Sequence, residues 1–304
     1  MNKKVLIMMS VFNGGLNIRR QITSILKQNN VDVHILIRDD GSDYETKKIL
    51  KAIQIEFPDN ITCSFDENVG WKQSFMSLLF NAEVGYDYYG FSDQDDLWME
   101  DKVISCINLM EKDPQEGIKL AHCNSLSVDC NLQRREEQEF RYACPPSHKA
   151  AIATEYFQGC GMLWNATAMD VIKSYRPQNK DLAHDYWVGL ICYFFGKIYF
   201  CEEPKFYHIR YESNSSEDGN VKKGRTKRLK MLISGANAYM NPSEDIKDGY
   251  SYLLDIKDKK FIDNIVNYKN SFLNKVYLLK DSSFSRPTLA STIWFKLAIL
   301  LNKY

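Results

Sequence analysis

Apolar runs and helix-spaced apolar positions alternate along the first half of the chain. Short apolar runs, typical of buried strands, lie at 5–11, 31–37, 61–65, 86–91 and 118–123. Between them, apolar residues recur at the three-to-four-residue spacing of a helix with one buried face, at 17–28, 44–57, 71–82 and 103–110. Strands alternating with helices in this order predict an α/β fold with a parallel, doubly wound sheet.

The first apolar run could also be taken for a secretion signal. It is short, lacks a small-residue cleavage site and is interrupted at Asn13-Gly14-Gly15, so we interpret it as a first buried strand. The eight cysteines are scattered and form no C-x-x-C pair, which is typical of reduced thiols in a cytoplasmic protein. Lys+Arg and Asp+Glu number 39 each, so the overall charge indicates no nucleic-acid partner.

Three carboxylates follow the fourth predicted strand within four residues, at Asp93, Asp95 and Asp96. Anions this close repel one another unless a cation lies among them. Because the motif holds no Cys or His, it favours Mg²⁺ or Mn²⁺ over zinc. A calcium EF-hand is excluded, since Trp98 and Ile104 stand where that loop needs Gly and Glu. The alternative is a solvated acidic turn.

Polar residues also follow the first and second predicted strands, at Ser10 and Asn13 and at Asp39 and Asp40. The carboxyl ends of parallel strands meet at one edge of a sheet, which is where such folds bind ligands. We therefore expect a nucleotide site there, with a cation for the phosphates. No G-x-G-x-x-G or P-loop motif is present, so a dinucleotide dehydrogenase or a P-loop enzyme is not expected.

Four motifs together carry a resemblance to a known family. They are Ser10-Val11-Phe12-Asn13-Gly14, Arg38-Asp39-Asp40-Gly41-Ser42, Asn68-Val69-Gly70 and Ser92-Asp93-Gln94-Asp95-Asp96-Leu97-Trp98. This series resembles that of family-2 inverting glycosyltransferases, and its D-Q-D-D-x-W form is similar to bacterial rhamnosyltransferase-like members that build capsule or cell-wall polysaccharides. The resemblance covers about residues 5–215. It implies an A-type glycosyltransferase fold that uses a UDP- or dTDP-sugar and Mn²⁺ or Mg²⁺.

The resemblance also assigns roles on the donor side. It implies that Asp40 accepts a hydrogen bond from a uracil or thymine base, that Asp93 holds the ribose and that Asp95 binds the metal. The nucleotide-binding residues it implies are Ser10, Phe12, Asn13, Asp40 and Asp93.

On the acceptor side, the stretch His184-Asp185-Tyr186-Trp187 matches the motif that supplies the catalytic base, so Asp185 is the expected base; its alternative is helix capping. The resemblance further implies that a Gly-rich strand containing Gly159, Cys160 and Gly161 lines the acceptor side, together with His184 and Trp187. For the glycines the alternative is a close backbone crossing, and for Trp187 it is the core. The acceptor would be a hydroxyl of a growing glycan or a lipid-linked molecule.

One stretch departs from the family pattern. Where the family has Y-R-x-H, whose His can complete the metal site, this chain has Tyr207-His208-Ile209-Arg210. A guanidinium cannot ligate a cation, but it pairs well with phosphate oxygens. Our hypothesis is that Arg210 contacts the diphosphate; the alternative is that His208 moves into the ligand position.

The composition changes after about residue 213. A polar loop at 213–220 is followed by a basic run at 222–230 and by helical pieces, so we expect a nucleotide-sugar-binding catalytic domain at 1–215 and a helical region at 216–304. The last apolar segment, 288–304, is too short to span a bilayer as one helix and carries Lys296. It suits contact with the anionic inner face of the plasma membrane, packing in a homodimer, or docking on its own domain.

Two rival functions stay open at this point. A non-catalytic nucleotide-sugar-binding or scaffold protein would keep Asp40 without needing Asp185. A sugar nucleotidyltransferase would also use a doubly wound sheet with metal-binding Asp residues, but it usually has a basic, Gly-rich loop near the first strand, which is absent here.

Overall fold

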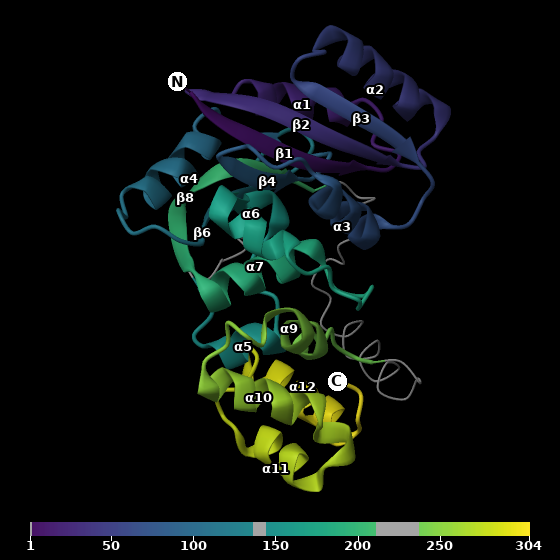
Figure 1. The fold of residues 1–304 in the computed structure, drawn as a ribbon. Coiled ribbons are helices and arrows are strands. Elements are labelled where there is room, and N and C mark those ends of the chain that lie inside the picture. Colours follow the sequence, from purple (N-terminus) through teal and green to yellow (C-terminus); the bar gives the residue numbers. More distant parts are fainter. Residues whose placement is uncertain (1, 136–143, 211–236) are drawn as a thin grey trace. The chain divides into compact units, whose positions relative to one another are not determined.

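The computed structural model describes residues 2–135, 144–210 and 237–304 (Figure 1). The chain divides into two compact units. The first contains residues 1–144, 157–176 and 183–211, and the second contains 145–156, 177–182 and 212–304. The predicted loop at 213–220 and the basic run at 222–230 lie outside the described residues. The roles given to the two predicted domains stay predictions.

Within the described residues, the first unit is built on an eight-stranded sheet of order β3-β2-β1-β4-β7-β6-β8-β5. The strands β3, β2, β1 and β4 are parallel, β7 runs antiparallel between β4 and β6, and β8 pairs in parallel with β6 and antiparallel with β5. Their bounds are β1 (Lys3–Val11), β2 (Val31–Asp40), β3 (Ile61–Asp66), β4 (Tyr88–Ser92), β5 (Leu97–Trp98), β6 (Lys119–Val128), β7 (Met162–Asn165) and β8 (Lys197–Ile209).

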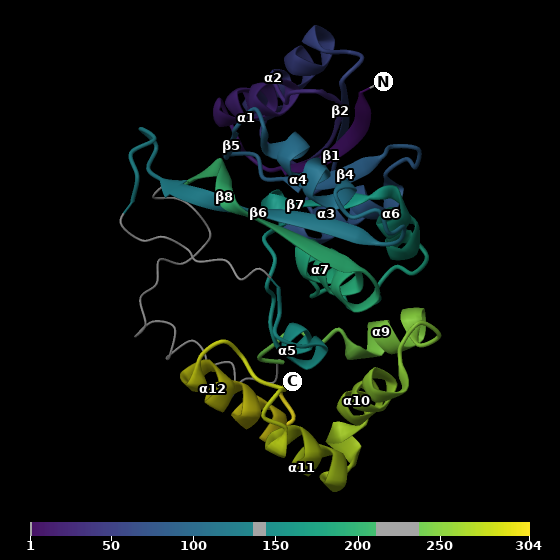
Figure 2. The same cartoon turned by 90° about the vertical axis from the view of Figure 1, so that its left-hand side faces the viewer.

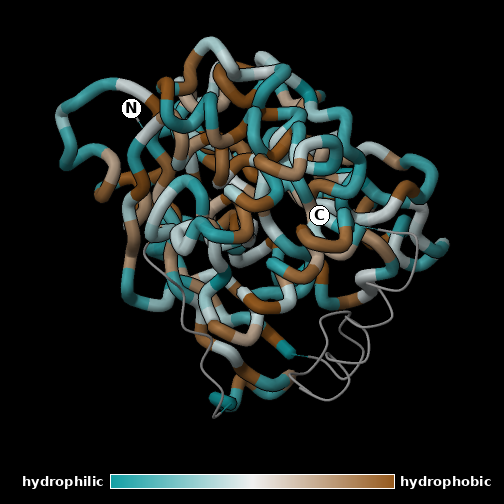
Figure 3. The backbone as a smooth tube through the Cα atoms, turned by 90° about the horizontal axis from the view of Figure 1, so that it is seen from below, coloured by the Kyte–Doolittle hydropathy of each residue, from teal (hydrophilic) through white to brown (hydrophobic). Residues whose placement is uncertain are grey.

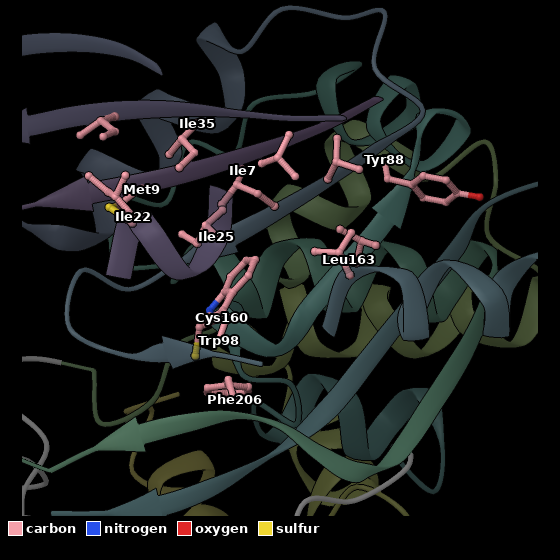
Figure 4. Close-up of a cluster of buried hydrophobic side chains, with 14 of the residues drawn as sticks. Ile7, Met9, Ile22, Ile25, Ile35, Tyr88, Trp98, Cys160, Leu163 and Phe206 are labelled. Carbon is pink, nitrogen blue, oxygen red and sulfur yellow. The ribbon is translucent and has the colours of Figure 1, made fainter. Parts of the chain in front are cut away.

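Helices cover both faces of this sheet, as expected for a doubly wound fold (Figures 1 and 2). One face carries α1 (Asn17–Leu26), α2 (Tyr44–Glu56) and α4 (Lys102–Glu111); the other carries α3 (Trp71–Asn81), α6 (Ala166–Lys173) and α7 (His184–Phe195). Being central, β1 is buried on both faces, which explains its unbroken apolar sequence. Its Ile7 and Met9 belong to one core cluster with Ile22 and Ile25 of α1 (Figure 4).

Three segments differ from the sequence prediction. β2 continues past residue 37 to Asp40, because it keeps pairing with both β1 and β3. β6 continues past residue 123 to Val128 by pairing with β8 across an irregularity at 123–125. Residues Gly159–Gly161, where the family resemblance implied a Gly-rich strand, form a single 3₁₀ turn, η1, which leads into β7.

The second unit is helical within its described residues. Its elements are α5 (His148–Ala153), α9 (Ser243–Tyr250), α10 (Ile256–Val266), η2 (Tyr268–Asn270), α11 (Phe272–Lys280) and α12 (Leu289–Leu300). Its core is aromatic and includes Phe284, Phe295 and Tyr304. The Tyr304 hydroxyl donates to the Ile152 carbonyl of α5 over 3.1 Å, which attaches that short helix to the C-terminal helices.

The predicted C-terminal apolar segment forms α12. Phe295, Ala298 and Ile299 bury one side of this helix in its own unit, and the Lys296 ammonium donates to the Leu278 and Asp281 carbonyls. No helix in the described part of the chain is long and apolar enough to cross a membrane. Figure 3 shows hydrophobic and hydrophilic residues alternating in short stretches along the backbone, as amphipathic elements require.

Candidate active site

Three carboxylates crowd the loop that follows β4. Burial, and then the charges of Asp96 and Asp95, raise the pKa of Asp93 to about 7. Burial, and then the charge of Asp96, raise the pKa of Asp95 to about 6. Both shifts have the same cause. The ionised carboxylates of Asp93 and Asp95 are destabilised by the loss of water around them and by the negative charge of adjacent carboxylates. A cation bound in the loop would reverse this penalty.

Asp96 meets two side chains from distant parts of the chain, Cys160 in η1 and His208 near the end of β8. The three offer ligand atoms that all lie within 4.8 Å of one another, and His208 Nδ1 is 3.2 Å from Asp96 Oδ1. Asp96 is 1% exposed, and neither of its carboxylate oxygens accepts a hydrogen bond of good geometry from the described residues. A buried carboxylate without such partners is costly, so the donor set fits a divalent cation.

The pKa of the His208 imidazole is set by its burial and by the neighbouring Asp96 carboxylate. Burial alone would lower the pKa of His208, but the Asp96 carboxylate outweighs burial and the pKa is raised. An imidazolium beside Asp96 partly compensates the buried charge. When the imidazole is neutral, the same ring can give a nitrogen lone pair to a metal ion.

Two glutamines hold the acidic loop in place. Gln94 bridges to the backbone of Phe12, accepting from its N–H over 3.0 Å and donating to its carbonyl over 3.1 Å. With its amide oriented to satisfy its neighbours, the buried Gln21 of α1 donates to the Asp96 carbonyl over 2.6 Å and accepts from Trp98 Nε1 over 3.1 Å. The loop is therefore fixed to the loop after β1 and to α1.

Asp40, the predicted base-recognition residue, lies at the end of β2. It is 1% exposed and accepts hydrogen bonds from the Val69 N–H (2.9 Å), the Gly70 N–H (3.0 Å) and the Arg38 guanidinium. Arg38 also donates to the Glu67 carbonyl over 2.9 Å. Asp40 thus anchors the loop between β3 and α3, and its contact with a base stays a prediction.

The loops after β1 and β2 are joined by direct contacts. The Asn13 N–H donates to Ser42 Oγ over 2.9 Å, and Asn13 Oδ1 accepts from the Asp43 N–H over 2.9 Å. Asn13 reaches this position with φ at 49°, a left-handed conformation that Asn tolerates well. Ser10 Oγ lies 2.5 Å from Ser74 Oγ of α3. Hydrogen bonds thus tie the predicted nucleotide-binding residues into one edge of the sheet.

Asp185 lies in the first turn of α7, and Ala183 occupies the N-cap position. Asp185 Oδ1 accepts a hydrogen bond from the Tyr186 N–H over 2.9 Å, and Asp185 Oδ2 accepts one from the Gly159 N–H over 3.3 Å. A Cβ atom on Gly159 would lie 2.8 Å from His184 Nε2 and 3.2 Å from Asp185 Cβ, so this position requires glycine. The η1 turn therefore contacts Asp185 through Gly159 and the acidic loop through the adjacent Cys160.

The two aromatic residues predicted on the acceptor side are buried. The His184 ring stacks on Phe75 with centroids 3.9 Å apart, and burial lowers its pKa to about 4, so it is neutral near pH 7. Trp187 is 0% exposed. Burial favours the core alternative for Trp187. His184 is also packed in the core, and its role on the acceptor side stays a prediction.

Arg210 follows the last residue of β8, and its N–H donates to the Val128 carbonyl over 2.8 Å. The positive charge of Arg210 opposes the rise in the pKa of His208 that Asp96 causes, but it does not reverse that rise. The structure places His208 against Asp96. The metal-ligand role of His208 and the contact of Arg210 with a diphosphate both stay predictions.

Two features of this site were not predicted from the sequence. The sequence prediction gave the metal to Asp95, a role that stays a prediction, whereas the structure brings Asp96 against Cys160 and His208. The sequence prediction also considered Cys160 only for the acceptor side, because no local pattern signals that a residue far along the chain meets the acidic loop.

A mixed sheet with helices on both faces and carboxylates gathered at its strand ends is typical of α/β folds that bind ligands at the carboxyl ends of their strands. The family model of glycosyl transferase family 2 matches residues 6–185, which is more than half of the chain. The chain therefore belongs to glycosyl transferase family 2, and the resemblance inferred from the motifs is confirmed.

Curated relatives include dTDP-rhamnosyl transferase RfbG of Shigella flexneri, 36% identical over 105 residues, which are 34% of this chain and 36% of that protein. The succinoglycan biosynthesis protein ExoW of Rhizobium meliloti is 28% identical over 95 residues, 31% of this chain and 30% of that protein. The matches thus span about a third of the length of these relatives.

Solved structures confirm the predicted A-type glycosyltransferase fold. S. aureus TarS 1-349 in complex with UDP-GlcNAc has a TM-score of 0.58 at 14% identity, covering 97% of this chain and 79% of that one. The mannosyltransferase PcManGT from Pyrobaculum calidifontis, in complex with GDP-Man and Mn²⁺, has a TM-score of 0.53 at 13% identity, covering 99% and 86%. At these identities the likeness concerns the fold alone.

Proposed function

We propose that this chain transfers a sugar from a UDP- or dTDP-sugar to a hydroxyl group, with inversion at the anomeric carbon and with a divalent cation. The observation that carries the proposal is the η1 turn. Its Gly159 N–H binds Asp185, and the neighbouring Cys160 lies beside Asp96 and His208. A base for the acceptor and a site for the leaving group are thus held by adjacent residues.

In the proposed reaction, the hydroxyl oxygen of the acceptor attacks the anomeric carbon of the donor sugar. Asp185 accepts the proton of that hydroxyl as it attacks. The bond from that carbon to the diphosphate oxygen breaks, and its electron pair stays on the diphosphate. The bound cation would neutralise charge on this leaving group. One base and one direct displacement invert the configuration, because retention by double displacement would need a second carboxylate as nucleophile.

We assign the cation to Asp96 of the acidic loop and to His208 of β8. Asp95, which precedes Asp96 in that loop, lies next to this site. Asp93 would hold the ribose, and Ser10, Phe12, Asn13 and Asp40 would form the nucleoside side of the site. The relative named as a dTDP-rhamnosyl transferase supports a rhamnosyl donor, and the succinoglycan biosynthesis relative supports a role in surface polysaccharide synthesis. The acceptor would then be a growing glycan or a lipid-linked molecule.

We further propose that the second unit contacts the anionic inner face of the plasma membrane. Phe272 and Leu273 at the start of α11 are 79% and 78% exposed, and Leu300 and Leu301 at the end of α12 are also exposed. Lys275 Nζ donates to the Leu300 carbonyl over 3.4 Å, which places these helix ends side by side. This α11–α12 patch of four apolar residues, with Lys275 at its edge, suits insertion among anionic headgroups.

The first prediction tests the base. Asp185→Asn should lower the turnover of a UDP- or dTDP-sugar by about 10²- to 10⁴-fold, the usual contribution of a general base. An Asn oxygen can still accept from the Tyr186 N–H, so folding should change by only about 1 kcal/mol. Turnover is measured by nucleotide release in the presence of acceptor and Mn²⁺.

Asp170→Asn on the exposed side of α6 is the matched control and should keep full turnover. Equal turnover of Asp185→Asn and Asp170→Asn would remove Asp185 from the mechanism and favour a nucleotide-sugar-binding protein or a nucleotidyltransferase.

The second prediction separates His208 from Arg210. His208→Ala should raise the Mn²⁺ concentration needed for half-maximal activity by about 10- to 100-fold, since it removes a ligand. Arg210→Ala should raise the KM for the donor while leaving the Mn²⁺ requirement near normal. If His208→Ala leaves the Mn²⁺ requirement unchanged and Arg210→Ala alone weakens donor binding, His208 is not a ligand.

The third prediction concerns the membrane. The full chain should co-sediment at low salt with vesicles containing anionic lipid, and the double variant Phe272→Ser, Leu273→Ser should bind several-fold less. Ile55→Ser, at an exposed apolar position on α2, is the matched control and should bind normally.

Failure of the wild-type protein to co-sediment would end the membrane proposal. If the double variant instead converts a dimer to a monomer in sedimentation velocity, without any change in vesicle binding, the patch is a subunit interface.

A further inference from the structure

The sulfur of Cys160 has a place in the cation site that the acidic motif alone does not reveal. Cys160 is buried, and its Sγ lies within 4.8 Å of the ligand atoms that Asp96 and His208 offer. It belongs to the same buried cluster as Trp98 and Phe206 (Figure 4), so apolar groups shield it from solvent. The question is whether this thiol is a core residue or a metal ligand.

The spacing of the three donor atoms matches what a small coordination shell needs. Bonds of about 2.0–2.3 Å to nitrogen, oxygen and sulfur in a tetrahedral arrangement put ligand atoms about 3.5 Å apart. A cluster already within 4.8 Å closes to that separation through side-chain movements of about 1 Å. The 3.2 Å between His208 Nδ1 and Asp96 Oδ1 is near it already.

The chemistry of the donor set points away from the hardest cations. Mg²⁺ prefers oxygen ligands and octahedral geometry, whereas sulfur and imidazole favour Zn²⁺, Co²⁺ and Cd²⁺. The backbone supports a fixed position for the sulfur, because Gly159 is held by Asp185 and because a Cβ on Gly161 would lie 3.0 Å from the Cys123 carbonyl oxygen.

We propose that Cys160 is the third protein ligand of the cation site, with Asp96 and His208, and that it makes the site bind thiophilic divalent cations more tightly than Mg²⁺. On binding, the sulfur bonds to the metal and the thiol proton passes to solvent. The inference rests on the cation site of the proposed function, but it concerns metal binding and can be tested without turnover.

The test is a Co²⁺ titration of the full chain, followed by absorption spectroscopy. The wild-type protein should show a sulfur-to-cobalt charge-transfer band at one equivalent. Cys160→Ser should lose the band, and Cys192→Ser, at a buried position on α7, should keep it. His208→Ala, which leaves every thiol in place, should bind Co²⁺ at least about tenfold more weakly.

A competition measurement then tests selectivity. Cys160→Ser should weaken Cd²⁺ binding at least about tenfold and change Mg²⁺ binding less than about threefold. A missing charge-transfer band in the wild-type protein overturns the proposal even if Cys160→Ser does not fold, as does a band that persists in Cys160→Ser. If Mn²⁺ binds but no band forms, only the sulfur ligand fails; if neither Mn²⁺ nor Co²⁺ binds, the cation site of the proposed function fails as well.

Discussion

The buried carboxylate of Asp96 is the feature on which the rest of this site depends. Asp96 is 1% exposed and has no hydrogen-bond donor of good geometry among the described residues, so its ionised form is stable only if a positive charge compensates it. His208 supplies part of that charge, and a cation would supply the rest. Burial, and then the charge of Asp96, raise the pKa of Asp93 and Asp95, so ionisation is disfavoured at these two positions of the acidic motif.

Contacts from the surrounding structure hold the acidic loop in place and keep its carboxylates close together. Gln21 and Gln94 fix the loop from α1 and from the backbone of Phe12, and η1 closes it from the other side. The same turn requires glycine at position 159, because the His184 ring leaves no room for a side chain. Packing in the core of the first unit therefore helps to fix the position of Asp185, the residue that we propose as the base.

Much of the first unit could be predicted from its sequence, because strand and helix periodicity is local and the family motifs lie at strand ends. The extension of β2 to Asp40 could not be predicted. The last residues of this strand are polar, and they are held in the strand by pairing with β1 and β3, which a local sequence pattern does not reveal. The meeting of Asp96 with Cys160 and His208 was also hidden, since it depends on β7 running antiparallel and on the length of β8. The preference for hard cations rested on residues inside one motif, and the fold adds a sulfur and an imidazole from elsewhere.

The most direct test of this account is the thermal stability of the chain with and without Mn²⁺. If the carboxylates of the acidic loop repel one another and bind a cation, Mn²⁺ should raise the Tm of the wild-type protein. The reason is that a ligand that binds only the folded state stabilises it by mass action. Asp96→Asn should raise the Tm without metal, since it removes a buried charge, and should abolish the response to Mn²⁺. A wild-type Tm that ignores Mn²⁺, together with an Asp96→Asn variant less stable than wild type, would contradict the claim that Asp96 is built to hold a cation.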